Sequence, residues 1–200
     1  MADPVAHTLV TGANGFVGCG VLERLHAALR PVTGSVRNEP QRRGCVRGPA
    51  LEGGDWSRLL EGCDTLVHTA ALVHLTREAA SDSLRAFRTV NVDGTLNLAR
   101  QAAAAGVRRF VFISSVKVHG EQSALAHPFT PTDAPSPKDA YGISKAEAEA
   151  ALKAIAAETA MEVVIIRSPL VYGPGVKGNF AAMMRAVARG LPLPFGAVTD

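Results

Sequence analysis

The chain has 200 residues, a length that allows one domain of ordinary size and leaves little for a second. Apolar residues make up 47% of it and charged residues 20%, the mix of an ordinary globular protein, which excludes a disordered chain. The 19 glycines and 12 prolines follow no period, which excludes a fibrous repeat, and the net charge of +3 is spread out, which argues against a nucleic-acid-binding protein.

Short β-rich segments alternate with longer helical segments along the chain. Such an alternation predicts βαβ units, so the expected fold class is α/β with a doubly wound parallel sheet. The last two strands are mostly apolar, which predicts that both of their faces are buried. The expected strands are 7–11, 32–36, 45–47, 65–69, 109–114 and 162–167, and the expected helices are 16–29, 56–60, 84–105, 141–159 and 179–189.

The cysteines and the N-terminus indicate where the protein works. Three cysteines without a CxxC pair indicate a reducing compartment and argue against a disulfide framework and a zinc site. No basic stretch followed by an apolar run stands at the N-terminus, and no segment reaches the roughly 20 apolar residues of a membrane helix. We expect a cytoplasmic protein. Because no histidine pair has metal-ligand spacing, no metal site is predicted.

The first candidate site is a glycine-rich turn that follows the first strand and opens the first helix. Glycines let the backbone turn sharply and let a pyrophosphate approach, while the helix N-terminus offers free N–H groups. The alternative is an ordinary strand–helix turn. We expect a dinucleotide site here, formed by Gly12, Asn14, Gly15, Phe16, Val17 and Gly18.

Two further motifs carry chemistry. Tyr141 and Lys145 lie four residues apart at the start of a predicted helix, and therefore on one face of it. A nearby ammonium favours the phenolate, so such a pair can exchange a proton with a substrate hydroxyl or carbonyl. Ser114 and Ser115 end a strand, at the sheet edge where parallel sheets place ligands. The alternatives are a surface Tyr–Lys pair and a strand-end serine.

Taken together and in order, these motifs resemble the extended short-chain dehydrogenase/reductase family, of the nucleotide-sugar epimerase/dehydratase type. The resemblance covers essentially the whole chain and implies a Rossmann fold, NAD or NADP as cofactor and a nucleotide sugar as substrate. The segments that carry it are VTGANGFVG (10–18), HTAA (68–71), NVDGTLNLA (91–99), FISSVKVHGE (112–121), YGISK (141–145) and RSPLVYGPG (167–175).

The resemblance also implies roles for individual residues. It makes Tyr141 the proton-transferring group, Lys145 the residue that binds the nicotinamide ribose and lowers the Tyr141 pKa, and Ser115 the catalytic serine. Further cofactor contacts are expected from Arg37, Ala70, Ala71, Asn91, Ser114, Tyr141, Lys145 and Pro169. Substrate contacts are expected from Ser115, His119, Tyr141, Ser168, Asn179 and Phe180.

Three departures from the family pattern bear on the cofactor and the site. Val36 followed by Arg37 stands where NAD-preferring members carry an acid, so Arg37 allows NADP; the alternative is that it stacks on adenine or points to solvent. The pair 48–49 replaces the usual adenine-binding aspartate segment, and we do not transfer that role to Asp55. His119 replaces a tyrosine and is expected to line the site.

The resemblance divides the chain and narrows the activity. Residues 1–167 are expected to form an NAD(P)-binding Rossmann domain, and residues 168–200 to begin a substrate-binding lobe that the chain does not complete. The expected activity is that of a 4-epimerase or 4-keto reductase acting on a UDP-N-acetyl sugar in bacterial polysaccharide synthesis. Two alternatives stay open, a nucleotide-binding protein without turnover and a reductase of another carbonyl compound such as a steroid. The expected partners are the UDP-sugar and a second copy in a homodimer, with neither nucleic acid nor membrane.

Overall fold

The structure of the chain, a computed structural model, forms two compact units. They comprise residues 1–169 and 170–200, and each unit is considered by itself. Within them the structure describes residues 6–73, 83–123, 127–176 and 178–192. Inside these segments, no helix has both the length and the hydropathy that a membrane span needs.

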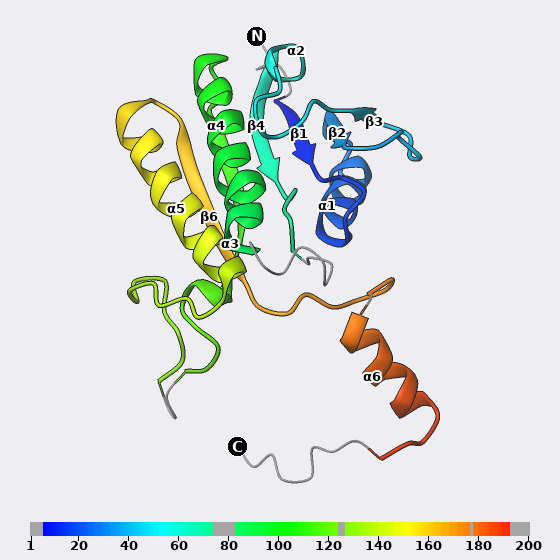
Figure 1. Cartoon of the computed structure of the whole chain (residues 1–200). Coiled ribbons are helices and arrows are strands. Elements are labelled where there is room, and N and C mark those ends of the chain that lie inside the picture. Colours follow the sequence, from blue (N-terminus) through cyan, green and yellow to red (C-terminus); the bar gives the residue numbers. More distant parts are fainter. Residues whose placement is uncertain (1–5, 74–82, 124–126, 177, 193–200) are drawn as a thin grey trace. The chain divides into compact units, whose positions relative to one another are not determined.

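Six parallel strands form one sheet in the first unit (Figure 1). They are β1 (His7–Thr11), β2 (Val32–Val36), β3 (Cys45–Arg47), β4 (Cys63–His68), β5 (Arg109–Ser115) and β6 (Glu162–Ser168). Their order across the sheet is β3-β2-β1-β4-β5-β6. β2 and β3 therefore lie on one side of β1, and β4, β5 and β6 lie on the other side. This order is that of a doubly wound Rossmann sheet, which confirms the predicted fold class.

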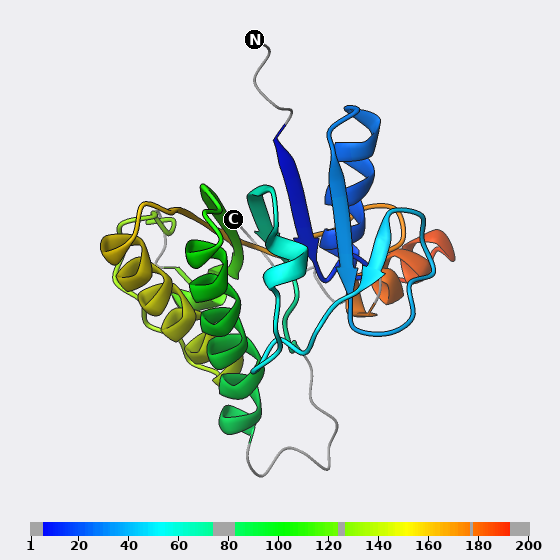
Figure 2. The same cartoon turned by 90° about the horizontal axis from the view of Figure 1, so that it is seen from above.

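Helices cover both faces of this sheet (Figure 2). They are α1 (Phe16–Ala27), α2 (Ser57–Leu60), α3 (Ser83–Phe87), α4 (Gly94–Ala104) and α5 (Ala140–Glu158); α6 (Gly178–Ala188) belongs to the second unit. Neighbouring residues of β1 separate the layers, because successive side chains of a strand point to opposite faces. Leu9 packs in one core cluster with Leu98 of α4 and Leu152 of α5, whereas Val10 packs in another with Leu22 of α1.

The helix expected over residues 84–105 is divided by a π-helical stretch. α3 continues into this stretch, η2 (Arg88–Asp93), and then into α4. Asn91 lies within η2 and is 1% exposed. Single π-helical turns inside helices are frequent at functional sites. Gly106, with a φ of 80°, follows the last turn of α4, so the helix ends where the sequence predicts it.

A short 3-10 turn and an aspartate cap prepare the start of α5. The turn η3 (Val116–Val118) directly follows β5. Asp139 Oδ1 accepts a hydrogen bond from the backbone N–H of Gly142 at 2.6 Å, which caps α5. With these details, the strands and helices begin and end within two residues of the predicted positions.

The prediction that β5 and β6 are buried on both faces is wrong for the described residues. β5 alternates between buried and half-buried positions, and on β6 Val164 and Ile166 are 40% and 45% exposed. The physical reason is their position at the far end of the strand order. Among the described residues of the first unit, the cluster around α1 includes side chains from β1 to β4 and none from β5 or β6.

Candidate active site

The glycine-rich turn between β1 and α1 leaves no room for side chains on its inner side. Gly12 has a φ of 69°, and a Cβ atom on it would lie 2.7 Å from the backbone nitrogen of Ala70. A Cβ atom on Gly18 would lie 2.3 Å from the carbonyl oxygen of Gly12. Gly15 is exposed and caps α1 without a side chain, and the first turn holds no acid. A bare backbone at a helix N-terminus is the arrangement that accommodates a phosphate.

Thr69 fastens the segment after β4 to this turn. Its Oγ1 donates to the carbonyl oxygen of Thr11 at 2.7 Å, and its backbone N–H donates to the same oxygen at 3.2 Å. The two strand ends are thereby joined, with Ala70 against Gly12 and Ala71 next along the chain. Thr69 belongs to the HTAA segment, but no role was predicted for it. The sequence signal that could have identified it is a hydroxyl side chain at a strand end, next to small residues.

The end of β2 leaves one cation available. Val36 is buried, whereas Arg37 is exposed and makes no hydrogen bond or ion pair within the described part of the chain. Asp55 accepts a hydrogen bond from the backbone N–H of Ser57 at 2.9 Å, and its side chain therefore binds the first turn of α2. The absence of an adenine role for Asp55 stays a prediction, whereas Arg37 is available to meet a ligand.

Asn91 joins the segment after β4 to α5. Its side-chain Oδ1 accepts from the backbone N–H of Leu72 at 2.8 Å, and its Nδ2 donates to the Leu72 carbonyl at 3.0 Å and to Ser144 Oγ at 3.1 Å. These contacts use the hydrogen-bonding groups of a side chain that water hardly reaches. Asn91 therefore holds the segment after β4 against α5. A direct contact of Asn91 with a cofactor stays a prediction, and this geometry does not favour it.

His68 is a buried, neutral side chain for which no role was predicted from the sequence. Thr95 Oγ1 donates to the Asn91 carbonyl, so it accepts from His68 Nε2 at 3.0 Å, and His68 Nδ1 accepts from Thr11 Oγ1 at 2.6 Å. Burial, together with the nearby Lys145 ammonium, lowers the pKa of His68 to about 3. This imidazole holds β1, β4 and α4 together and carries no charge at neutral pH.

Tyr141 and Lys145 stand on the first two turns of α5. Lys145 is 2% exposed, and its Nζ lies 4.1 Å from the centroid of the Phe112 ring on β5. Burial lowers the pKa of Lys145 to about 7, against the opposing effect of Glu149. The Tyr141 ring meets Phe87 edge-on, with ring centroids 5.9 Å apart. At neutral pH the Lys145 amine is therefore divided between its charged and neutral forms.

The pKa of Tyr141 moves in the direction opposite to the expectation. Burial of the phenol raises it, and the carboxylate of Asp139 adds to the effect. Lys145 does not offset these causes in the protein alone, because its ammonium lies over the Phe112 ring and is itself partly deprotonated at neutral pH. A lowering of the Tyr141 pKa by Lys145 stays a prediction for the site with its ligands bound.

Ser115 lies at the same edge of the sheet as Tyr141. Its Oγ accepts from the backbone N–H of Lys117 at 3.2 Å, which caps η3. Lys117 forms an ion pair with Asp139, and a Cβ atom on Gly142 would lie 2.8 Å from the Lys117 carbonyl. The turn after Ser115 is thus packed against the first turn of α5, which carries Tyr141.

The remaining residues predicted at this edge fall into two groups. Ser168 lies beside Ser115 in the register of β5 and β6, and Pro169 follows it. Ser114 lies on the opposite face of the strand from Ser115, because side chains alternate along a strand. It is 3% exposed, and its Oγ donates to Glu149 Oε1 at 2.5 Å. Ser115 is the hydroxyl available to a ligand, and a cofactor contact of Ser114 stays a prediction.

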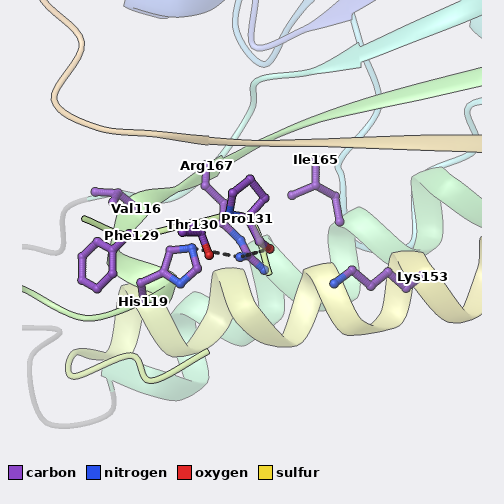
Figure 3. Close-up of a pocket in the computed structure, with 8 residues that line it drawn as sticks. All are labelled: Val116, His119, Phe129, Thr130, Pro131, Lys153, Ile165 and Arg167. Atoms are coloured by element: carbon purple, nitrogen blue, oxygen red, sulfur yellow. Dashed lines mark hydrogen bonds between the residues drawn. The ribbon is translucent and has the colours of Figure 1, made fainter. Parts of the chain in front are cut away.

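A buried ion pair behind Ser114 joins α5 to β6, and neither of its residues was assigned from the sequence. Arg167 donates to the Glu149 carboxylate through Nε at 3.1 Å and through Nη2 at 2.7 Å. The Arg167 Nη1 donates to His119 Nε2 at 2.9 Å and to the Pro131 carbonyl at 3.2 Å (Figure 3). Glu149 lies on a helix and Arg167 on a strand 18 positions further along, so neither sequence pattern carries a signal for the pair.

His119 lines a cavity of about 350 Å³ on the α5 side of the sheet. Lys153 of α5, Ile165 of β6 and the segment 129–131 also line this cavity (Figure 3). The His119 ring is 8% exposed and stacks on Phe129, with ring centroids 5.0 Å apart. His119 is therefore a buried partner of the Arg167 cluster, and a contact with substrate stays a prediction.

The second unit holds the last predicted substrate contacts. Phe180, at the start of α6, stacks on Tyr172 with ring centroids 5.1 Å apart. The predicted role of Asn179 falls on a side chain outside the described residues. Across the described parts of both units, no three His, Cys, Asp or Glu side chains gather as a metal site requires.

Comparisons with known proteins agree with this geometry. A family model described as the NAD dependent epimerase/dehydratase family matches residues 8–198. A UDP-glucose 4-epimerase of Vibrio cholerae is 43% identical over 196 residues, covering 96% of this chain and 60% of the relative. A 3-beta-hydroxysteroid dehydrogenase of Mycolicibacterium neoaurum is 32% identical over 205 aligned positions, covering 95% of this chain and 56% of the relative.

A solved structure extends the likeness to three dimensions. The structure of MoeE5 in complex with UDP-glucose and NAD is similar with a TM-score of 0.80 at 31% sequence identity. The similarity covers 94% of this chain and 63% of that one. The chain thus spans less than two thirds of the length of each of these three proteins.

Proposed function

Because the chain belongs to the NAD dependent epimerase/dehydratase family, we propose that it binds NAD or NADP at the glycine turn and acts on a nucleotide sugar as a 4-epimerase. The observation that carries this proposal is the buried Lys145, one helical turn after Tyr141, at the sheet edge where Ser115 ends β5. A buried amine beside a phenol and a hydroxyl is suited to moving a proton at a sugar hydroxyl.

The residues at the sheet edge fit a dinucleotide. The backbone of Gly12, Gly15 and Gly18 offers the cradle that Cβ atoms would fill, so these residues would hold the pyrophosphate. Ala70 lies against the same turn and would contact the ribose of the cofactor. Lys145 makes no hydrogen bond within the described residues, which leaves its amine for the nicotinamide ribose. When bound, the nicotinamide supplies a reversible hydride acceptor.

Three side chains of this protein would then manage the oxygen of the sugar. Tyr141 would take the proton of the sugar 4-hydroxyl while that carbon gives up its hydride, and would return the proton to the oxygen when the hydride comes back. The configuration inverts because the hydride returns to the opposite face of the 4-keto sugar. Ser115 donates a hydrogen bond to the same oxygen and holds it toward Tyr141. The protonated form of Lys145 stabilises a negatively charged Tyr141 oxygen during the transfer.

The relatives support UDP-glucose as the first substrate to test. The Vibrio cholerae relative is a UDP-glucose 4-epimerase, and MoeE5 was solved with UDP-glucose and NAD. The UDP-N-acetyl sugar expected from the sequence and the 4-keto reductase reaction come second. We also infer a homodimer, which light scattering coupled to size-exclusion chromatography tests.

The test of the function is turnover with analysis of the products. The protein is incubated with NAD and either UDP-glucose or UDP-N-acetylglucosamine, and the 4-epimers are separated by anion-exchange chromatography. A UDP-galactose product supports the proposal. No epimer from either sugar, at enzyme concentrations where NAD is bound, overturns it and supports the nucleotide-binding protein without turnover.

A second candidate function is oxidation of a hydroxysteroid. The 3-beta-hydroxysteroid dehydrogenase of Mycolicibacterium neoaurum, which is 32% identical, favours it. The same protein is therefore mixed with NAD and a 3β-hydroxysteroid, and NADH is followed by its absorbance. Formation of NADH with the steroid, and no epimer from UDP-sugars, would decide for this second function.

A further inference from the structure

Glu149 carries a buried carboxylate on the same face of α5 as Lys145, one helical turn further along. Its side chain is 2% exposed, a place where an unpaired charge is costly. Its two oxygens accept from Ser114 Oγ at 2.5 Å and from Arg167 Nη2 at 2.7 Å. The carboxylate is thus held in one position by partners from β5 and β6.

These partners connect Glu149 to the parts of the site that must stay aligned. Ser114 is the residue before Ser115, so its bond to Glu149 fixes the end of β5 against α5. Arg167 is the residue before Ser168 and fixes the end of β6 in the same way. Arg167 also reaches His119 and the Pro131 carbonyl, which ties the loop after η3 to the same point (Figure 3).

Glu149 also affects the charge of the Lys145 amine. Of the groups facing the amine, His68 of β4 is neutral and Phe112 of β5 is an uncharged ring. Tyr141, on the same helix, has a raised pKa and is protonated at neutral pH. Arg167 of β6 is the positive charge of this cluster and is paired with Glu149. The Glu149 carboxylate, on the next turn of α5, is the charge that opposes the effect of burial on the Lys145 amine.

We propose that Glu149, held by Ser114 and Arg167, is a positioning residue of the site: it places a buried negative charge one helical turn from the Lys145 amine and locks α5 onto the ends of β5 and β6. That this matters for turnover rests on the proposed function of Lys145. The effect on the charge of Lys145 can be measured without turnover.

The first test is the protonation of Lys145 in the variant Glu149→Gln. Gln keeps the size of the side chain and an acceptor for Ser114, and removes the charge. The chain has five lysines, so the titration of each ¹³C-labelled Cε can be followed by NMR. We expect the ratio of charged to neutral Lys145 at a given pH to fall by about tenfold, the change that one pKa unit makes. An unchanged Lys145 titration would overturn the proposal.

Glu147→Gln is the matched control on the same helix. Glu147 is half-buried, with 35% of its side chain exposed, and pairs with Arg88 through contacts of 2.5 to 3.2 Å. Removing its charge should leave the titration of Lys145 at its parental position. A shift as large as that of Glu149→Gln would show that any carboxylate on α5 has this effect, and would overturn the specific role of Glu149.

A double variant separates positioning from simple loss of stability. Glu149→Gln leaves the Arg167 charge buried without its partner, which itself destabilises a fold. In Glu149→Gln/Arg167→Met both charges are absent, so the unfolding midpoint should recover toward that of the parent. The Lys145 titration should stay shifted. A double variant that recovers both stability and the parental titration would show that the pair is merely structural.

The pH profile of epimerisation connects the inference to function. In both Glu149 variants the pH range in which the rate depends on charged Lys145 should move to lower pH, in step with the NMR titration. An unmoved profile alongside a shifted titration would overturn the catalytic relevance of Glu149. A parent without turnover, together with the shifted titration, would refute the proposed function and leave the charge relation standing.

Discussion

Acidification from pH 7 to pH 5 should weaken the fold through His68. This imidazole has a pKa of about 3 in the folded chain and 6.5 as an ordinary histidine, because burial excludes its charged form. The folded state therefore binds fewer protons than the unfolded state between these values. The contribution of neutral His68 is complete above about pH 6.5 and is lost progressively as the pH falls toward 3.

The magnitude follows from the width of that window. Each pKa unit corresponds to about 1.4 kcal/mol, so the 1.5 units between pH 6.5 and pH 5 amount to about 2 kcal/mol of unfolding free energy. Lys145, with a pKa of about 7 against 10.5 in the unfolded chain, acts in the same direction. It contributes well under 1 kcal/mol in this interval, because below pH 7 its amine is largely protonated in both states.

Urea unfolding measures this effect directly. Trp56 is the sole tryptophan of the chain and is 2% exposed, so its fluorescence reports unfolding. Unfolding free energies at pH 7 and pH 5 are compared between the parent and His68→Gln, whose amide can still bond to Thr11 and Thr95. The parent should lose about 2 kcal/mol more than the variant, since carboxylates and other histidines are common to both.

The exposed His26 supplies the control, and His26→Gln should keep the full pH dependence of the parent. If His68→Gln keeps it as well, the imidazole titrates near its ordinary pKa in the folded chain. The reasoning from burial to charge at this position would then fail.

Three further predictions concern the ligands. Gly15→Val should abolish binding of NADH in a fluorescence titration by filling the exposed start of α1, whereas Gly20→Ala, with open space around its added Cβ, should bind like the parent. Arg37 should let NADPH bind about as well as NADH; a preference for NADH above about tenfold, or about 1.4 kcal/mol, would exclude its role with the 2′-phosphate. Tyr141→Phe should lower the turnover of UDP-glucose by about 10²–10⁴-fold with nearly unchanged cofactor affinity, and more than Ser115→Ala does; parental turnover in Tyr141→Phe would refute its role as acid and base.

The elements of the fold could be predicted because their signals are local. Apolar segments bounded by glycines mark strands, and the glycine turn at Gly12 also requires the positive φ that the structure shows. The open face of Val164 and Ile166 could not be predicted in this way. Whether an apolar strand is covered depends on helices elsewhere in the chain, and the strand's own residues do not record them.

The site was predictable in its residues and not in its electrostatics. The positions of Ser115 and Tyr141 follow from strand ends and helix starts, which are readable along the chain. The raised pKa of Tyr141 depends on burial, a property of the assembled layers. The pairing of Glu149 with Arg167 joins residues 18 positions apart on a helix and a strand, and their separate patterns contain no sign of the contact.

The π-helical stretch η2 makes the number of residues before α4 as important as their identity. An α-helix turns by about 100° for each residue, so deletion of one residue from η2 would rotate α3 by about that angle relative to α4. Phe87 would then leave the ring of Tyr141, and Asn91 would leave Leu72 and Ser144. Single substitutions along this helix leave its register intact. Insertion or deletion of one residue would instead separate the contacts of the site to α5 from those to the glycine turn.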